Sequence, residues 1–280
     1  MDFSKFSRLI MIEQTLFALP FALIGVLFAG GGTLKIWLWV ITALAAARTA
    51  GMSFNRAIDA EIDARNPRTK DRLIPKGELR PAEAWATAIV ASVVLIGASF
   101  MLNRLCFYLS FPAVFLLFTY SYFKRFSSSS HFYLGLVEAA APMGGYIAAT
   151  GKFTPVPFVL GLIIMTWIAG LDIVYALVDL DFDRKEGLHS IPARLGRKKA
   201  LVLSALCYMF SISAMICAGV LTHMELPYWI AICFIGIIFL YQQKLARKEN
   251  IALAIKDFFK INMYISPALF FGTLTNVLFK

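Results

Sequence analysis

Long apolar stretches separated by short polar ones run along the whole chain. An α-helix needs about 20 mainly apolar residues to cross the hydrocarbon core of a membrane, and these stretches approach that length. The pattern predicts nine membrane-spanning helices, with glycine, proline and charged residues gathered between them. The helices are expected at about residues 9–29, 35–54, 82–102, 105–123, 132–150, 156–177, 200–221, 226–241 and 263–279. The sequence therefore predicts an all-α integral membrane protein.

The composition supports this interpretation. Of the 280 residues, 59% are hydrophobic and 16% are charged, whereas soluble domains have about 45–50% apolar and about 25% charged residues. A net charge of +10 would suggest nucleic-acid binding in a soluble protein. Here most of the cations lie on one side of the predicted membrane helices. We therefore expect the protein to be surrounded by membrane lipid and not to bind nucleic acid.

Lysine and arginine favour the cytoplasmic side of a membrane. With the N-terminus inside, one side holds Lys5, Arg8, the 55–80 loop, Lys124, Arg125, the 184–199 loop and the cations from Lys244 to Lys260. The other side holds only Lys35, Arg104, Lys152 and Lys280. We therefore expect a multi-pass protein of the cell (inner) membrane. Its N-terminus and its main polar loops would be cytoplasmic, and the odd number of helices would leave the C-terminus outside.

Two polar stretches interrupt the apolar pattern in matching ways. The first, Asn55–Gly77, contains four acidic and six cationic residues in 23 positions. Within it Asp59 and Asp63 are four residues apart, which places both carboxylates on one face of a helix. Asp179 and Asp183 repeat this spacing, each 120 residues after its counterpart. We interpret the two pairs as the duplicated halves of one active site, facing the cytoplasm.

The residue types in these stretches suit a metal–diphosphate complex. Asn55, Asp59 and Asp63 offer hard oxygen ligands, which Mg²⁺ prefers in combination with substrate phosphates and water. The cationic residues that follow are Arg65, Arg68, Lys70 and Arg72 in the first stretch and Arg184, Lys185, His189 and Arg194 in the second. Such cations would bind the anionic oxygens. One cluster alone could be an ordinary solvated loop, but two at matched positions favour a site.

Charged and aromatic residues near the predicted helix ends add candidates. Arg48 precedes Asn55 by seven residues and so shares its helix face. An arginine inside a membrane usually faces a partner or a wet cavity, so Arg48 is either a diphosphate or carboxylate ligand or the partner of an acid such as Glu138. Tyr120 and Lys124, at i and i+4, are either interfacial anchors or part of the site.

The cysteines and two of the histidines suggest no chemistry. The cysteines are Cys106, Cys207, Cys217 and Cys233, all within apolar segments and without metal-ligand spacing. We expect them to be small buried apolar side chains. His131 and His223 are expected to be isolated loop histidines without a role.

The two acidic motifs resemble those of the UbiA superfamily of intramembrane aromatic prenyltransferases. The first signature of that family is N-D-x-x-D-x-x-x-D, and here Asn55, Asp59 and Asp63 match it while Arg56 stands in place of the second-position acid. The second signature, D-x-x-x-D, is matched by Asp179 and Asp183. The surrounding Y-A-L-V-D-L-D-F-D, A-R-L-G and R-T-K-D-R-L-I-P-K-G are similar to the 4-hydroxybenzoate polyprenyltransferase branch.

The resemblance implies a single transmembrane prenyltransferase domain over residues 1–280, with nine helices around a central cavity. It also implies Mg²⁺, a polyprenyl diphosphate donor and an aromatic acceptor. By the family pattern the metal ligands would be Asn55, Asp59, Asp63, Asp179 and Asp183, of which the four aspartates are the catalytic candidates. The residues expected to meet diphosphate or acceptor are Arg48, Asn55, Arg68, Lys70, Arg72, Tyr120, Lys124, Tyr175 and His189.

The resemblance leaves the acceptor open. The phrase F-N-R-x-I-D-x-x-I-D-A-R-N-P-R-T looks similar to family members of the futalosine route to menaquinone. The acceptor is therefore expected to be 4-hydroxybenzoate, as in ubiquinone biosynthesis, or 1,4-dihydroxy-6-naphthoate.

Two other classes of protein compete with the enzyme. Secondary transporters also have repeated halves and charged residues within the membrane, although their polar breaks usually lie in mid-helix, whereas the acids here lie at helix ends. A non-catalytic lipid-binding scaffold would not need two matched carboxylate pairs.

Overall fold

The described part of the chain is helical throughout. The computed structural model describes residues 3–278, with the backbone alone for Phe3 and for residues 13–18. The helices are α1 (Phe3–Ile10), α2 (Ile12–Phe28), α3 (Leu34–Ile58), α4 (Ala60–Arg65), α5 (Pro81–Leu102), α6 (Arg104–Phe123), α7 (Ser130–Thr150), α8 (Pro155–Ala176), η1 (Leu177–Asp179), α9 (Leu180–Lys185), α10 (Ile191–Leu221), α11 (Leu226–Ala246), α12 (Ile251–Asn262) and α13 (Ile265–Leu278). No strand occurs among these residues, so the predicted all-α class is confirmed.

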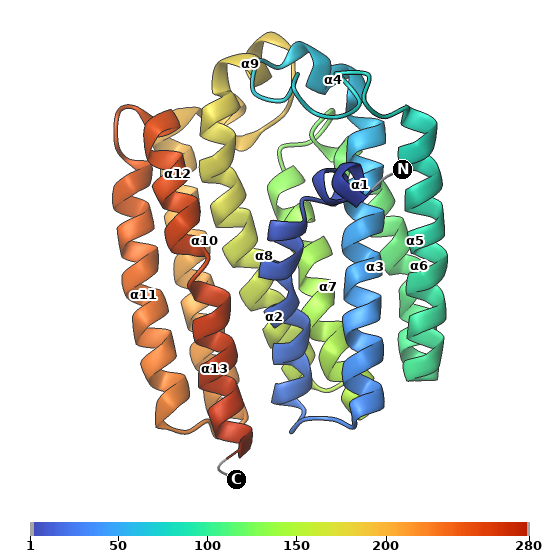
Figure 1. Cartoon of the computed structure of the whole chain (residues 1–280). Coiled ribbons are helices and arrows are strands. Elements are labelled where there is room, and N and C mark those ends of the chain that lie inside the picture. The colour runs from blue at the N-terminus through green and yellow to red at the C-terminus, as the bar shows by residue number, and fades with distance from the viewer. Residues whose placement is uncertain (1–2, 279–280) are drawn as a thin grey trace.

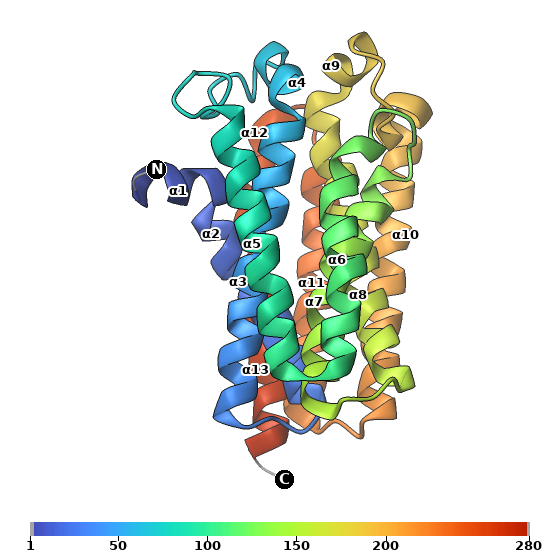
Figure 2. The same ribbon diagram turned by 90° about the vertical axis from the view of Figure 1, so that its right-hand side faces the viewer.

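The long helices run side by side in one bundle (Figure 1). The short helices α4 and α9, which carry parts of the two acidic motifs, lie at the same end of this bundle in both views (Figures 1 and 2). Helix α13 ends at the opposite end (Figure 1). Two motifs that are 120 residues apart in the sequence therefore share one end of the molecule.

Six of the described helices are long and apolar enough to cross a membrane. They are Leu34–Ile58, Pro81–Leu102, Arg104–Phe123, Pro155–Lys185, Ile191–Leu221 and Leu226–Ala246, and Leu19–Phe28 is a shorter apolar helix. Large apolar side chains such as Leu240 and Val93 are exposed on the outside of the bundle, as in a protein surrounded by lipid. The chain is therefore a multi-pass membrane protein, and a count of nine crossings stays a prediction.

Two helix starts are more complex than predicted. The first predicted helix, from residue 9, is broken at Met11, whose left-handed backbone (φ 51°) separates α1 from α2. The helix predicted from residue 200 is preceded by a short helical stretch from Ile191, which the Ser190 side chain caps by accepting a hydrogen bond from the Ala193 N–H. The non-helical Gly196 (φ 77°, ψ 164°) separates this stretch from the long part of α10, which therefore starts near the predicted residue. The predicted end at residue 279 lies outside the described residues.

Helices α2 and α7 approach each other through glycine. A Cβ on Gly145 would lie 2.0 Å from the Ala22 carbonyl oxygen, and one on Gly25 would lie 2.1 Å from that of Pro142. The two backbones are therefore in direct contact, which is the close packing that small residues permit in membrane proteins. A Cβ on Gly144 would meet nothing within 4 Å.

The expectation that all four cysteines are buried is wrong for two of them. Cys106 and Cys207 are buried, whereas Cys217 and Cys233 are exposed. They lie on outward faces of α10 and α11, where Val220 and Ile237 are exposed as well. Helical spacing decides which apolar residues face lipid, and the overall hydrophobicity of a segment does not show it.

Candidate active site

The first acidic motif spans the junction of α3 and α4, because Asp59 has a non-helical backbone (φ −90°, ψ 4°) between the end of α3 at Ile58 and the start of α4 at Ala60. The Asp59 N–H donates to the Asn55 carbonyl (2.9 Å) and the Asp63 N–H to the Asp59 carbonyl (2.8 Å). The side-chain amide of Asn55 donates to Asp59 Oδ2 (2.8 Å) and to the hydroxyl of Ser121 on α6 (3.1 Å). Asn55 therefore fixes the first carboxylate against α6.

Both carboxylates of this motif are buried and are paired with cations. Lys124 Nζ lies 2.7 Å from Asp59 Oδ2, and Arg72 Nη1 lies 2.6 and 2.7 Å from the two oxygens of Asp63. Buried charges persist where they are paired and hydrogen-bonded. Arg72 and Lys124, which the sequence analysis assigned to the diphosphate, thus form ion pairs with the acids that it assigned to the metal.

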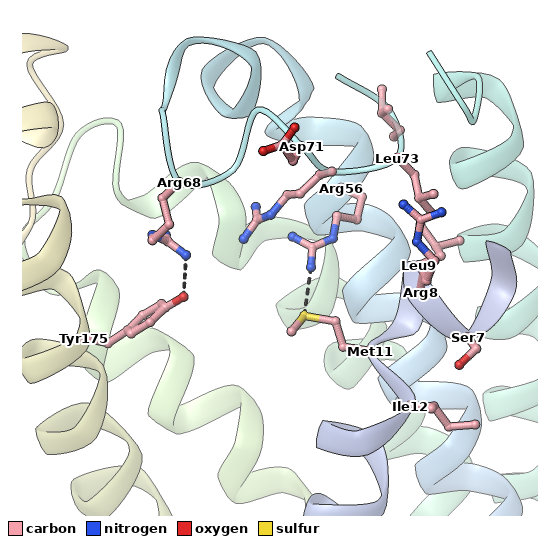
Figure 3. Close-up of a pocket in the computed structure, with 12 residues that line it drawn as sticks. Ser7, Arg8, Leu9, Met11, Ile12, Arg56, Arg68, Asp71, Leu73 and Tyr175 are labelled. Atoms are coloured by element: carbon pink, nitrogen blue, oxygen red, sulfur yellow. Dashed lines mark hydrogen bonds between the residues drawn. The ribbon is translucent and has the colours of Figure 1, made fainter. Parts of the chain in front are cut away.

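The second acidic motif is bound by the loop after α4. Arg68 donates from Nε to Asp179 Oδ1 (3.0 Å) and from Nη2 to Oδ2 (2.6 Å), and the Asn66 amide adds a bond of 3.2 Å. Arg68 also lies over the Tyr175 ring, 4.7 Å from its centroid, and donates to its hydroxyl (Figure 3). Burial is the largest single effect and lowers the pKa of Arg68, but the hydrogen bonds to Asp179 and the nearby Tyr175, Asp179 and Asp63 groups together raise the pKa above its usual value.

Other predicted residues lie at the rim of these pairs. The His189 N–H donates to the Lys124 carbonyl (2.8 Å), which brings the second polar loop onto the end of α6. The Tyr120 hydroxyl donates to the Gly51 carbonyl on α3 (3.3 Å) and so lies within the bundle. Asp183 is buried beside the second loop, whereas Lys70 is exposed.

Arg48 has the partner that the sequence offered as the alternative to a ligand role. Its Nη1 lies 2.7 Å from Glu138 Oε1 of α7, and both side chains are largely buried. Arg48 Nε is buried as well, and the ion pair leaves this donor without a partner among the described residues.

His131 is not an isolated loop histidine, and that prediction is wrong. It lies in α7 with 3% of its surface exposed, and its Nδ1 is 2.7 Å from Asp172 Oδ2 of α8. Its Nε2 accepts the Ile191 N–H at the start of α10 (3.1 Å), so the proton of the neutral ring is on Nδ1 and is donated to Asp172. These partners are 41 and 60 residues away in the chain. The sequence indicated this pair only through Asp172, an acid within an apolar helix, which needs a partner.

The donor set fits Mg²⁺ bound together with a diphosphate. Among the described residues, no three of the His, Cys, Asp and Glu side chains cluster as a ready-made metal cage. Mg²⁺ commonly takes one or two carboxylates and completes its shell with substrate phosphates and water. Asp59 Oδ1 is buried and accepts no hydrogen bond among the described residues. Its ion-pair partner Arg125 Nη2 lies 3.6 Å away, so this hard oxygen has an unused acceptor position for a metal ion.

A cavity of about 480 Å³ adjoins the site. Arg56, Arg68 and Arg72 line it on the side of α3 and its following loop, and Tyr175 lines it from α8. Residues at the end of α1 and at Met11 form the opposite side (Figure 3). A hollow lined by four arginines, Arg8 among them, and by partly apolar walls suits an anionic organic ligand.

The fold and the site together define an all-α enzyme embedded in the membrane, with mostly buried acidic groups paired with partly exposed cations at one end of an apolar bundle. The chain belongs to the UbiA prenyltransferase family, whose family model matches residues 18–264. It is therefore a prenyltransferase, as the motifs predicted, and the transporter and scaffold alternatives are set aside.

Individual relatives cover most of the chain. It is 29% identical over 248 residues to a 4-hydroxybenzoate octaprenyltransferase of Pectobacterium carotovorum subsp. carotovorum (strain PC1), covering 88% of this chain and 86% of the relative. It is 32% identical over 228 residues to the enzyme of the same name from Vibrio atlanticus (strain LGP32), covering 80% and 78%.

Solved structures agree with the fold. The apo structure of a UbiA homolog from Aeropyrum pernix K1 superposes with a TM-score of 0.87 at 29% identity, covering 94% of this chain and 98% of the other. A UbiA homolog from Archaeoglobus fulgidus bound to GPP and Mg²⁺ superposes with a TM-score of 0.71 at 17% identity, covering 98% and 99%.

Proposed function

We propose that this chain transfers a polyprenyl group from a polyprenyl diphosphate to the ring of an aromatic hydroxy acid of the 4-hydroxybenzoate type, in quinone biosynthesis and with Mg²⁺. The observation that carries the proposal is the set of buried carboxylates at one end of an apolar bundle. The buried Asp59 and Asp63 and the partly buried Asp179 each lie within 3 Å of a lysine or arginine. The relatives named 4-hydroxybenzoate octaprenyltransferases support the acceptor, and the homolog bound to GPP and Mg²⁺ supports the donor and metal.

The carboxylates and cations would exchange partners when the donor binds. Asp59, Asp63, Asp179 and Asp183, with Asn55, would hold Mg²⁺. Bound Mg²⁺ neutralises the diphosphate and weakens the bond between its oxygen and the allylic carbon.

The cations now on these acids would turn to the diphosphate oxygens. Arg68, Arg72 and Lys124 would then stabilise the negative charge that develops on the leaving group. These cations lie within hydrogen-bond distance of the acids that would hold the metal, next to the place proposed for the diphosphate.

Transfer then follows from the allylic fragment. The C–O bond breaks with its electron pair going to the diphosphate, an electron-rich ring carbon of the acceptor forms the new C–C bond, and that carbon loses its proton. The rings of Tyr120 and Tyr175 would shield the allylic cation by cation–π attraction of about 0.5–2 kcal/mol each. The prenyl tail would extend sideways into lipid, which is why such chemistry takes place within a membrane.

The orientation belongs to the same proposal. The chain would lie in the inner membrane of the cell. The end of the bundle with α4 and α9 would face the cytoplasm, because most lysines and arginines lie in the loops of that end.

A second acceptor, 1,4-dihydroxy-6-naphthoate, is favoured by one observation, namely Arg56 within the F-N-R-x-I-D phrase. Membranes containing the chain, Mg²⁺ and a labelled polyprenyl diphosphate, offered the two acceptors in parallel, would test the proposal. A prenylated product from one acceptor identifies it. No product from either acceptor, even without EDTA and with Mg²⁺ present, would contradict the proposal.

A further inference from the structure

His131 and Asp172 form a buried pair that the proposed transfer does not use. His131 Nδ1 lies 2.7 Å from Asp172 Oδ2, and 3% of the surface of His131 is exposed. The Nε2 of the same ring accepts the N–H of Ile191 at 3.1 Å. Because Asp172 takes the proton on Nδ1, it keeps Nε2 free to accept. The pair therefore binds the first turn of α10 by a directed hydrogen bond.

This first turn also contacts α9, which carries the second acidic motif. The Ser190 hydroxyl accepts the Ala193 N–H at 3.4 Å and is hydrogen-bonded to the side chain of Asp183. Arg184 Nε donates to the Ala193 carbonyl at 3.3 Å. The start of α10 thus lies between the second motif and His131 of α7.

The long part of α10 does not hold this turn in place. Gly196 has a non-helical backbone that separates residues 191–195 from the rest of α10. A helical stretch this short is not stable alone, so its position depends on its contacts. The Arg184 bond is exposed, whereas the His131 bond is buried, and a buried hydrogen bond is stronger because the local dielectric constant is low. His131 is therefore the firmer anchor.

The loop between α9 and this turn reaches both acidic motifs. The Leu188 N–H donates to the Asp183 carbonyl and the His189 N–H to the Lys124 carbonyl, both at 2.8 Å. Lys124 Nζ in turn lies 2.7 Å from Asp59 Oδ2. A displacement of the first turn of α10 would therefore move the loop that meets both halves of the site.

We propose that His131 is a positioning residue, which fixes Ile191 and Ser190 and through them orients the Asp183 carboxylate for the metal. Asp172 keeps the imidazole in the tautomer that this requires. The inference rests on the proposed function and deepens it, because it makes the geometry of the second motif depend on a histidine outside both motifs.

Hydrogen exchange of the purified, metal-free full chain measures the anchoring directly. In His131→Ala the Ile191 N–H loses its acceptor, so peptides covering residues 186–195 should exchange about 10-fold faster than in the wild type. His131→Gln should restore much of the protection, because its amide can donate to Asp172 and accept from Ile191. Exchange in His131→Ala at the wild-type rate would overturn the proposal.

The matched control is Ser204→Ala in the long part of α10. Ser204 is fully buried and donates to the Gly170 carbonyl of α8 at 2.8 Å. It also accepts from the Gln243 amide at 2.9 Å. Its loss should therefore destabilise the bundle, but exchange over residues 186–195 should stay at the wild-type rate.

Mg²⁺ titration of transfer from a labelled polyprenyl diphosphate separates positioning from general stability. His131→Ala should raise the Mg²⁺ concentration for half-maximal transfer about 10-fold, since loss of a group that orients a metal ligand costs about 10- to 100-fold in metal affinity. His131→Gln should need less Mg²⁺ than His131→Ala, and Ser204→Ala should need the wild-type concentration. Equal shifts in His131→Ala and Ser204→Ala would overturn the proposal.

Ser190→Ala decides the matter if His131→Ala fails to fold. It keeps the His131–Asp172 pair and removes the hydroxyl between the first turn of α10 and Asp183. Its Mg²⁺ requirement should rise as well, and an unchanged requirement would overturn the proposal. Absence of Mg²⁺-dependent transfer by the wild-type chain would instead refute the proposed function.

Discussion

Arg68 holds Asp179 through three hydrogen bonds, from Nε to Oδ1 at 3.0 Å and to Oδ2 at 3.2 Å and from Nη2 to Oδ2 at 2.6 Å, although the residues are 111 positions apart. Arg68 belongs to the loop that follows the first acidic motif, and Asp179 begins the second. This pair joins the two halves of the duplicated pattern into one site. It also keeps a cation where the diphosphate would leave.

Arg68→Ala should lower kcat/KM for prenyl transfer about 10- to 100-fold, because the lost hydrogen bonds to charged groups contribute about 1.5–3 kcal/mol. The kcat/KM of Arg68→Lys should lie between those of the wild type and Arg68→Ala, since lysine keeps the charge without the fork geometry. The measurement is transfer from a labelled polyprenyl diphosphate at fixed Mg²⁺.

The matched control is Arg65→Ala. Arg65 pairs with Glu186 across the same two loops at 2.8 Å, but its side chain is 54% exposed, against 31% for Arg68. An exposed pair contributes little, so activity should stay near the wild-type level. Equal losses in both variants would mean that loop tethering, and not contact with the site, is what Arg68 provides.

The contact between α2 and α7 predicts a contrast between neighbouring glycines. Gly145→Ala forces a Cβ to within 2.0 Å of a carbonyl oxygen, so we expect a loss of about 1–3 kcal/mol from overpacking. Gly144→Ala meets open space and should change stability little. Thermal unfolding in one detergent measures both variants, and similar midpoints would show that the helices can separate without cost.

The His131–Asp172 pair should stabilise the junction of α7, α8 and α10. His131→Ala removes the donor to Asp172 and the acceptor for the Ile191 N–H, and unsatisfied groups of this kind cost about 1–3 kcal/mol each. Asp172 is 26% exposed, so water would offset part of its share.

His131→Gln should recover part of this stability, because its amide can both donate and accept. The control is His223→Asn at an exposed loop position with φ 52°, a conformation that asparagine tolerates. A similar unfolding temperature for His131→Ala and the wild type would mean that the pair contributes nothing to the fold.

Much of the fold and site follows from local patterns. The length of each apolar run marks the long helices. The backbone bonds from Asp59 to Asn55 and from Asp63 to Asp59 keep the predicted i, i+4 relation, although the helix is interrupted at Asp59 between α3 and α4. Matching positions in the two halves also indicated a shared end of the bundle, which the fold has (Figures 1 and 2).

Contacts between distant segments could not be predicted in the same way. The partners of His131 come from two other helices, and the left-handed Met11 interrupts a run that is apolar on both sides. The pairing of Arg68 and Arg72 with the acids depends on how one loop folds back. Composition identified these cations but not the carboxylate that each one meets.

The most direct test of the account is prenyl transfer by the purified chain with and without Mg²⁺, in the wild type and in Asp59→Ala and Asp183→Ala. We predict one diphosphate released for each prenylated acceptor formed, only with Mg²⁺, and no transfer by either variant although both fold and insert. Each variant lacks a ligand from a different motif, so both halves of the site are tested. Full transfer by either variant, or transfer that continues in EDTA, would contradict the assignment of the two motifs to one metal–diphosphate site.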